Sequence, residues 1–282
     1  FVYYIIFIIL YSNLHKLNMT GEKNAIILDL DETIGHFSQI YVFWCLLKVY
    51  INDNNINWKN ILFILFDMFP YIFRPEIFEI FKLIMKNKQN NKCNYVCIYT
   101  NNNGPYFWVE FIKSYIHIKL NYNLIDKIIR AFIVGNRVIE QMRTNNNKTF
   151  SDLINCTKLP KNTRFCYIDD TYYPDMIHDN IVYLKIEPYV YEMSYIEMAN
   201  IFYNNNKKLF KNNKAHFIKF IKNELYNTDK NYAIKNKTNT ELNIDRLVSN
   251  KIYNHLIKFF NNKNKTLKNK QANNKTKKYI SN

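Results

Sequence analysis

The amino-acid sequence predicts an α/β fold in which helices cover a central parallel sheet. Short apolar runs that end in polar, turn-prone residues indicate buried strands, and they occur near residues 25–30, 94–99, 131–134, 165–169 and 181–184. Segments with helical spacing lie between them near residues 75–88, 105–117 and 149–155. This alternation is typical of a doubly wound, three-layer sandwich. A composition of 48% apolar residues supports a substantial core.

The first predicted strand leads into the most informative segment of the chain. Apolar residues 25–28 are followed by Asp29 and Asp31, so two carboxylates leave the strand where the backbone turns. Open α/β sheets bind their ligands at this end of the strands. An acidic turn without a function has the same local pattern, so other segments have to distinguish the two interpretations.

A pair of carboxylates with this spacing suits phosphoryl transfer. Asp29 can attack a phosphorus atom if a cation screens the phosphate charge, which gives an aspartyl-phosphate intermediate. Asp31 can protonate the leaving oxygen and then take a proton from the water that hydrolyses the intermediate. The segment therefore supplies a candidate nucleophile and a candidate general acid/base.

Thr100 and Asn101 follow the second predicted strand, and Lys148 precedes the third predicted helix. A hydroxyl and backbone N–H groups at a strand end can hold phosphate oxygens, and a fixed ammonium can neutralise a transferring phosphoryl group. Asn103 and Pro105 suit the start of the helix that follows Thr100. Ordinary turn chemistry also explains a Thr-Asn pair, and most lysines lie in solvent.

Asp169 and Asp170 come at the end of another apolar run. Two adjacent carboxylates repel each other, and a hard divalent cation relieves this repulsion. Mg²⁺ is therefore the expected cofactor.

Together these residues resemble the haloacid dehalogenase (HAD) superfamily, and within it the RNA polymerase carboxy-terminal-domain phosphatases (FCP/SCP-type). The resemblance covers residues 24–190 and rests on the motif at residues 29–36, on Arg74-Pro75, Tyr99-Thr100 and Lys148, and on residues 168–170. It implies a HAD-like Rossmannoid sandwich. Two departures are visible: three asparagines follow Thr100 where the family has small residues, and the spacing around Lys148 is loose.

The resemblance also implies a role for each site residue. Asp29 corresponds to the nucleophile and a metal ligand, and Asp31 to the general acid/base that binds metal through its carbonyl. Thr100, with Asn101, and Lys148 correspond to the phosphate-binding groups. Asp170 corresponds to the direct Mg²⁺ ligand, and Asp169 to a water-mediated or supporting one.

The activity implied is that of a Mg²⁺-dependent phosphomonoester hydrolase acting on phosphoserine or phosphothreonine in proteins. Two alternatives stay open on the sequence: a polynucleotide 3′-phosphatase that uses a basic tail to follow the nucleic-acid backbone, and a non-catalytic binding module that retains the fold. The presence of every motif residue disfavours the binding module.

The charge distribution indicates three regions. Residues 1–203 carry 20 Lys+Arg against 19 Asp+Glu, whereas residues 204–282 carry 19 against 4. We therefore expect a phosphatase domain at 19–203, with a small helical cap at 37–73, and a basic extension at 204–282 with two amphipathic helices and a disordered end from about Asn261. The extension could bind nucleic acid or another polyanion, but the codon bias of an A/T-rich genome explains its Lys/Asn content as well.

Two further features bear on location. The five cysteines lack the paired spacing of a zinc site or a disulfide framework, which favours reduced thiols in an intracellular protein, cytoplasmic or nuclear. The apolar run at residues 1–11 is too short to cross a bilayer, so a membrane location is not expected. Met19 suits a natural start, and residues 1–18 are expected to be upstream translation or a truncated anchor.

Overall fold

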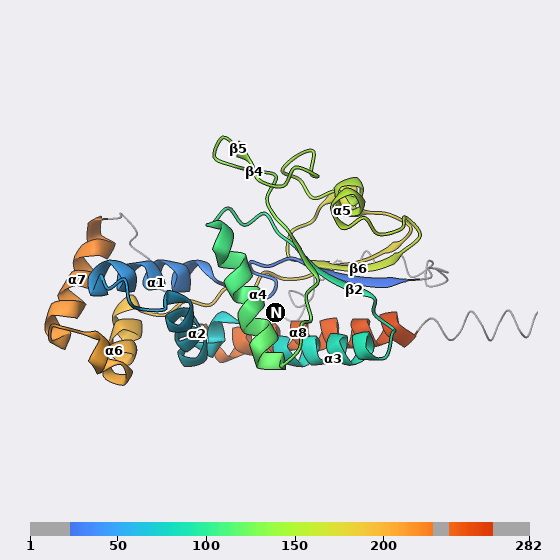
Figure 1. Cartoon of the computed structure of the whole chain (residues 1–282). Coiled ribbons are helices and arrows are strands. Elements are labelled where there is room, and N and C mark those ends of the chain that lie inside the picture. Colours follow the sequence, from blue (N-terminus) through green and yellow to red (C-terminus); the bar gives the residue numbers. More distant parts are fainter. Residues whose placement is uncertain (1–22, 228–236, 262–282) are drawn as a thin grey trace, which may run out of the picture. The chain divides into compact units, whose positions relative to one another are not determined.

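The computed structural model describes residues 23–227 and 237–261 (Figure 1). These residues form two compact units. The first contains the residues before Gly35, then Glu76–Pro188 and the residues from Arg246 onward, and the second contains Gly35–Pro75 and Tyr189–Asp245. The sequence-based expectations for residues 1–18 and for the end of the chain after Asn261 lie outside the described residues.

The first unit is built on a five-stranded parallel sheet. Its strands, in the order β3-β2-β1-β6-β7, are Lys127–Ile129, Tyr95–Tyr99, Asn24–Leu28, Arg164–Asp169 and Ile181–Lys185. Each neighbouring pair is parallel. The predicted α/β fold with a central parallel sheet is therefore confirmed, and four of the five strands lie where the sequence predicts them.

The prediction of a sheet strand at 131–134 is wrong. Ile133–Val134 (β4) instead pairs antiparallel with Arg137–Val138 (β5) in a separate two-stranded sheet. Gly135 turns the chain back with a φ of 58°, a conformation that glycine adopts without steric cost. The preceding segment, Lys127–Ile129, pairs with β2 as the edge strand. The longer apolar run, at residues 131–134, therefore led to the wrong assignment of the edge strand.

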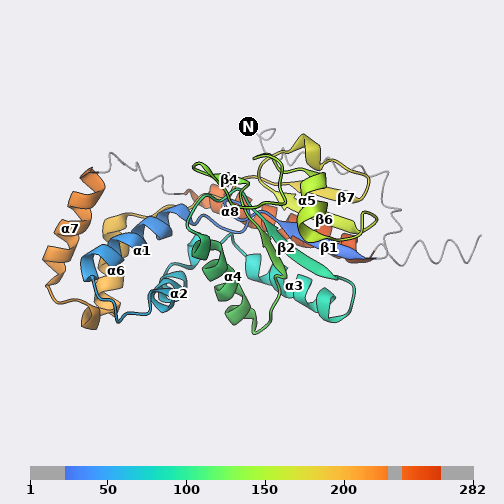
Figure 2. The same ribbon diagram turned by 45° about the horizontal axis from the view of Figure 1, so that its top comes forward.

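Helices flank the sheet on both faces, as Figures 1 and 2 show. Helix α5 (Phe150–Thr157) covers one face, where its Leu153 packs in a cluster with Ile27 and Tyr167. Helix α3 (Ile77–Gln89) lies on the other side and contacts α4 (Tyr106–Leu120). The three predicted helices are present. The residue that caps α4 is Pro105, without a side-chain hydrogen bond, so Asn103 does not cap it.

The last described helix, α8 (Asn239–Asn261), completes the first unit from Arg246 onward. Its buried residues follow helical spacing and include Val248, Ile252, Leu256, Phe259 and Phe260. The guanidinium of Arg164 on β6 lies 4.1 Å from the centre of the Phe259 ring. This part of the expected basic extension is therefore packed into the sheet unit, and the two units do not divide at residue 203.

The second unit is helical. It contains α1 (Ser38–Ile51), α2 (Trp58–Met68), α6 (Tyr195–Asn205) and α7 (Lys214–Asn227), with short 3-10 turns at Pro70–Ile72 and Lys207–Leu209. A third such turn, Pro174–Met176, lies in the first unit. The insert after the first strand is helical, as predicted. The ring of Phe43 in this insert packs against the ring of Phe202 in α6, and the two ring centres are 6.2 Å apart.

Two expectations on location can be compared with the structure. Across residues 23–227 and 237–261, no helix combines the length and apolar character needed to cross a membrane. All five cysteines are free, and four of them are buried.

We expect Leu256→Ala to lower the free energy of unfolding by about 2–5 kcal/mol, because this fully buried side chain would leave a cavity in the core. Leu247→Ala on the same helix is the matched control, since Leu247 is 53% exposed. The control should change stability by less than about 0.5 kcal/mol. Chemical denaturation measures both, and equal, small effects would contradict the packing of α8.

Candidate active site

The site lies where the chain order of the sheet reverses. Strand β1 is flanked by β2 on one side and β6 on the other, and ligands of open α/β sheets bind at such a switch point. Leu28 and Ile168 are register partners, and the Asp29 N–H donates to the Ile168 carbonyl at 2.9 Å. This pairing places Asp29 and Asp169 at neighbouring strand ends.

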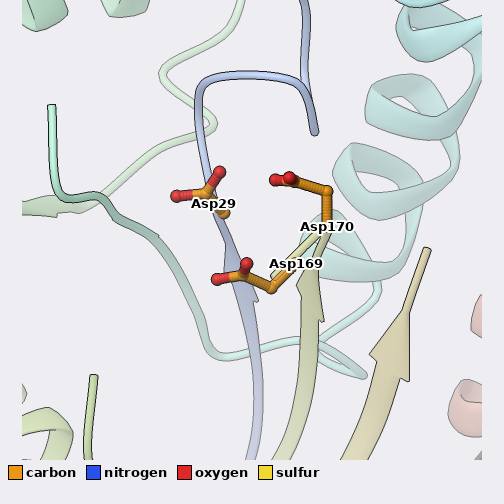
Figure 3. A group of neighbouring side chains, drawn as sticks. All are labelled: Asp29, Asp169 and Asp170. Atoms are coloured by element: carbon orange, nitrogen blue, oxygen red, sulfur yellow. The ribbon is translucent and has the colours of Figure 1, made fainter. Parts of the chain in front are cut away.

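Three carboxylates gather there. Asp29, Asp169 and Asp170 offer oxygen atoms that all lie within 4.8 Å of one another. Figure 3 shows the three side chains at the ends of β1 and β6. Carboxylate oxygens are the ligands that hard divalent cations prefer. The donor set therefore fits Mg²⁺, and these residues are the ones that would hold it. The expectation for Asp31 concerns its main-chain carbonyl, so its side chain is not expected among these three carboxylates.

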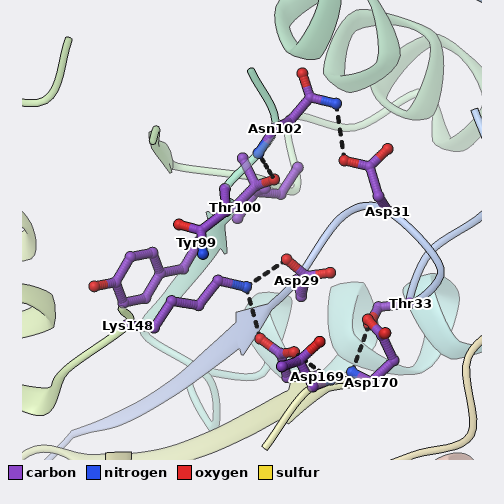
Figure 4. Close-up of polar contacts among 12 residues, drawn as sticks. Asp29, Asp31, Thr33, Tyr99, Thr100, Asn102, Lys148, Asp169 and Asp170 are labelled. Carbon is purple, nitrogen blue, oxygen red and sulfur yellow. Dashed lines mark hydrogen bonds and ion pairs between the residues drawn. The ribbon is translucent and has the colours of Figure 1, made fainter. Parts of the chain in front are cut away.

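Lys148 is buried among these acids. Its Nζ donates to Asp29 Oδ1 at 2.5 Å and to Asp169 Oδ2 at 2.6 Å (Figure 4). Burial by itself lowers the pKa of Lys148, but the two carboxylates outweigh burial and raise it. The rings of Tyr99 and Tyr173 lie 5.7 and 5.3 Å from the ammonium. Lys148 is therefore a fixed, buried cation at the strand ends. It does not lie in solvent, as most lysines do.

The pKa values of Asp29 and Asp170 lie above the ordinary value of a carboxyl group. Burial raises the pKa of Asp29 to about 8, with a smaller contribution from the charge of Asp169, while Lys148 acts in the opposite direction. Burial and Asp169 also raise the pKa of Asp170. Burial is the larger cause of both pKa shifts, and the charge of Asp169 adds to it. A bound cation would favour the ionised forms.

Further hydrogen bonds orient the two aspartates of β6. Asp169 accepts from the hydroxyl of Tyr167 and, at 2.8 Å, from the Thr171 N–H. Thr33 donates to Asp170 Oδ1 at 3.1 Å and accepts from the Asp170 N–H. Oδ2 of Asp169 thus accepts from both Lys148 and Tyr167.

The loop after β2 forms the opposite wall of the site. Thr100 is buried, and its Oγ1 accepts from the Asn102 N–H at 2.9 Å. Asn102 Nδ2 donates to Asp31 Oδ2 at 2.8 Å (Figure 4). Asn101, which the sequence suggested as a phosphate-binding residue, is exposed and donates instead to the hydroxyl of Tyr173.

Arg143 connects the loop after β2 to the segment that precedes Lys148. Its buried guanidinium donates to Asn101 Oδ1 at 2.9 Å and to the carbonyls of Asn146 and Asn147 at 2.9 and 3.2 Å. Asn147 directly precedes Lys148. One side chain thereby fixes the backbone before Lys148 relative to the loop after β2.

The structure brings together Asp29, Asp31, Thr100, Lys148, Asp169 and Asp170, each of which the sequence suggested, from separate segments of the first unit. Sequence reasoning missed Tyr167, Asn102 and Arg143. Tyr167 shares a strand face with Asp169, so alternation could have suggested it. Asn102 was visible only as one of three asparagines, and no local pattern indicated Arg143.

Comparisons with protein-family models, with curated proteins and with solved structures found no match for this chain. The geometry of the site therefore carries the argument about function.

We expect Lys148→Met to lower the free energy of unfolding by about 3–5 kcal/mol at pH 8, because it leaves buried carboxylates without their cation. The loss should shrink as the pH falls. Carboxyl groups with a raised pKa favour the folded state below their unfolded pKa, and this contribution disappears as the pH rises through the folded value. Urea denaturation from pH 5 to pH 8 measures this. Exposed Lys161→Met is the control, and a pH-independent loss would contradict the prediction.

We expect Mg²⁺ to stabilise the protein by about 2.7 kcal/mol at about 100 times its dissociation constant. Asp170→Asn should abolish this effect because it removes one of the three clustered carboxylates. Asp175→Asn, an exposed acid close in sequence, should keep it. Thermal unfolding with and without Mg²⁺ tests the site, and equal Mg²⁺ responses of the two variants would rule out this position.

Proposed function

We propose that this chain is a Mg²⁺-dependent phosphomonoester hydrolase of the haloacid dehalogenase type, working through an aspartyl-phosphate on Asp29. The observation that carries the proposal is the buried contact of Lys148 with Asp29 and Asp169, because a fixed ammonium beside a candidate nucleophile serves phosphoryl transfer. The acids of β6 and the hydroxyl of Thr100 support it.

In the first step a carboxylate oxygen of Asp29 attacks phosphorus, and the bond between phosphorus and the leaving oxygen breaks. Asp31 gives its proton to that oxygen, so an alcohol leaves and Asp31 becomes a carboxylate. In the second step water attacks the phosphorus of the aspartyl-phosphate and gives its proton to Asp31. The bond between phosphorus and the Asp29 oxygen breaks, which releases phosphate and restores both acids.

The cation would be held by Asp29 and Asp170, with Asp169 in support. When bound, Mg²⁺ screens the negative charge of the phosphate and of the surrounding carboxylates. Lys148 neutralises part of the charge on the phosphoryl group, and the Thr100 hydroxyl and neighbouring N–H groups hold its oxygens. These residues bind and orient the substrate for in-line attack.

We propose phosphoserine or phosphothreonine in proteins as the substrate, on the resemblance to carboxy-terminal-domain phosphatases. A panel of phosphopeptides, 3′-phosphorylated oligonucleotides and small phosphoesters tests this choice. Preference for the oligonucleotides, with activity that weakens steeply with salt and with deletion of residues 262–282, would replace it by the 3′-phosphatase alternative.

Asp29→Asn should reduce turnover by about 10³-fold or more, because it removes the attacking oxygen. Wild type should require Mg²⁺ and should carry a phosphoryl group on Asp29 after rapid quenching, which mass spectrometry of the peptide detects. Asp175→Asn is again the control and should keep wild-type activity. Full turnover by Asp29→Asn, or turnover without a divalent cation, would contradict the proposal.

A further inference from the structure

Three consecutive asparagines follow Thr100, and they have different surroundings. Asn101 contacts Arg143 and the hydroxyl of Tyr173, and Asn103 is exposed. Asn102 is half-buried, and its Nδ2 donates to Asp31 Oδ2 at 2.8 Å (Figure 4). The middle asparagine thus contacts the candidate general acid.

The amide of Asn102 is held by its own loop. Its backbone N–H donates to Thr100 Oγ1 at 2.9 Å, and its Oδ1 accepts from the Gly104 N–H at 2.9 Å. A Cβ at Gly104 would lie 2.9 Å from Asn102 Oδ1, so glycine leaves the room that this turn needs. Because Oδ1 accepts from a backbone donor, Nδ2 is the group that faces the carboxylate of Asp31.

We propose that Asn102 is a positioning residue that holds Asp31 for protonation of the leaving oxygen. This inference rests on the proposed function and adds one residue to its machinery. While the bond between phosphorus and the leaving oxygen breaks, the proton of Asp31 moves to that oxygen, and the remaining carboxylate keeps the hydrogen bond from Asn102. A donor of this kind is strengthened as its acceptor becomes charged.

The role has a chemical signature that a merely structural residue lacks. A p-nitrophenolate leaves readily without a proton, whereas the alkoxide of a serine side chain needs one in the transition state. Loss of the positioning residue should therefore slow phosphoryl transfer to Asp29 from an alkyl phosphate much more than from p-nitrophenyl phosphate. A general loss of folding or of phosphate binding would slow both equally.

The test compares kcat/KM for a phosphoserine peptide and for p-nitrophenyl phosphate in the full chain with Mg²⁺. This ratio reports the steps up to departure of the leaving group and excludes the later hydrolysis of the aspartyl-phosphate, in which Asp31 also acts. Asn102→Ala removes the amide. Asn102→Asp keeps the oxygen that accepts from Gly104 but replaces the donor with a second carboxylate. Asn103→Ala is the matched control in the same loop, and thermal unfolding checks that each variant is folded.

We expect both Asn102 variants to lower kcat/KM for the phosphoserine peptide about 10- to 100-fold, the size of one hydrogen bond to a charged group. For p-nitrophenyl phosphate the loss of kcat/KM should stay below about 3-fold, because its leaving oxygen needs little proton transfer. Asn103→Ala should resemble wild type. Adding Asn102→Ala to Asp31→Asn should cost nothing further, since Asn102 acts through Asp31.

Equal losses on the two substrates, or additive losses in the double variant, would overturn the positioning role while leaving the phosphatase proposal intact. Wild-type protein that hydrolyses no phosphoester with Mg²⁺ would overturn the proposed function, and with it this inference. The two failures are therefore distinguishable from the wild-type measurement alone.

Discussion

The candidate site depends on the balance of charge around one buried ammonium. Lys148 lies against Asp29 and Asp169, and Asp170 follows on the same strand end. Removing ionised groups from water costs several kcal/mol per ion, on the order of magnitude of a whole domain's stability. Such a cluster persists only if its members neutralise one another. One cation lies among three acids. Burial, with a smaller contribution from the charge of Asp169, raises the pKa values of Asp29 and Asp170.

This arrangement of one ammonium and three carboxylates connects the structure to the proposed chemistry. A divalent cation at the three carboxylates would complete the neutralisation and restore the ionised form of Asp29 that nucleophilic attack requires. A phosphate group brings further negative charge, which Lys148 and the cation would both meet. Under the proposed function, the charges that stabilise the fold would also serve phosphoryl transfer.

The sheet provides the precision that this arrangement needs. Parallel pairing of β1 with β6 and with β2 brings three strand ends to one edge, which carries Asp29, Asp169 and Thr100. Loops then add Lys148 and Asp31, and Arg143 and Asn102 hold those loops through hydrogen bonds. The chain leaves the sheet unit after Ile34, soon after Asp29 and Asp31, and returns at Glu76. The helical insert therefore interrupts the chain without interrupting the sheet.

The sequence by itself determined the strands that carry the acids and the identity of the main site residues. Runs such as 25–28 and 165–168 are apolar on both faces, and short runs of this kind are typical of buried parallel strands. Local patterns failed at the sheet edge, where the run at 131–134 is more apolar than Lys127–Ile129 but is folded back by the turn at Gly135.

Only the tertiary structure decided which polar side chains meet. Asn102 and Asp31 are 71 positions apart, and Lys148 and Asp29 are 119 apart, so no periodicity connects them. The tertiary structure also decided that α8 covers the sheet. The buried apolar stripe of this helix packs on the unit formed by residues far earlier in the chain. Contacts of this kind depend on how segments converge in space, which composition and spacing do not encode.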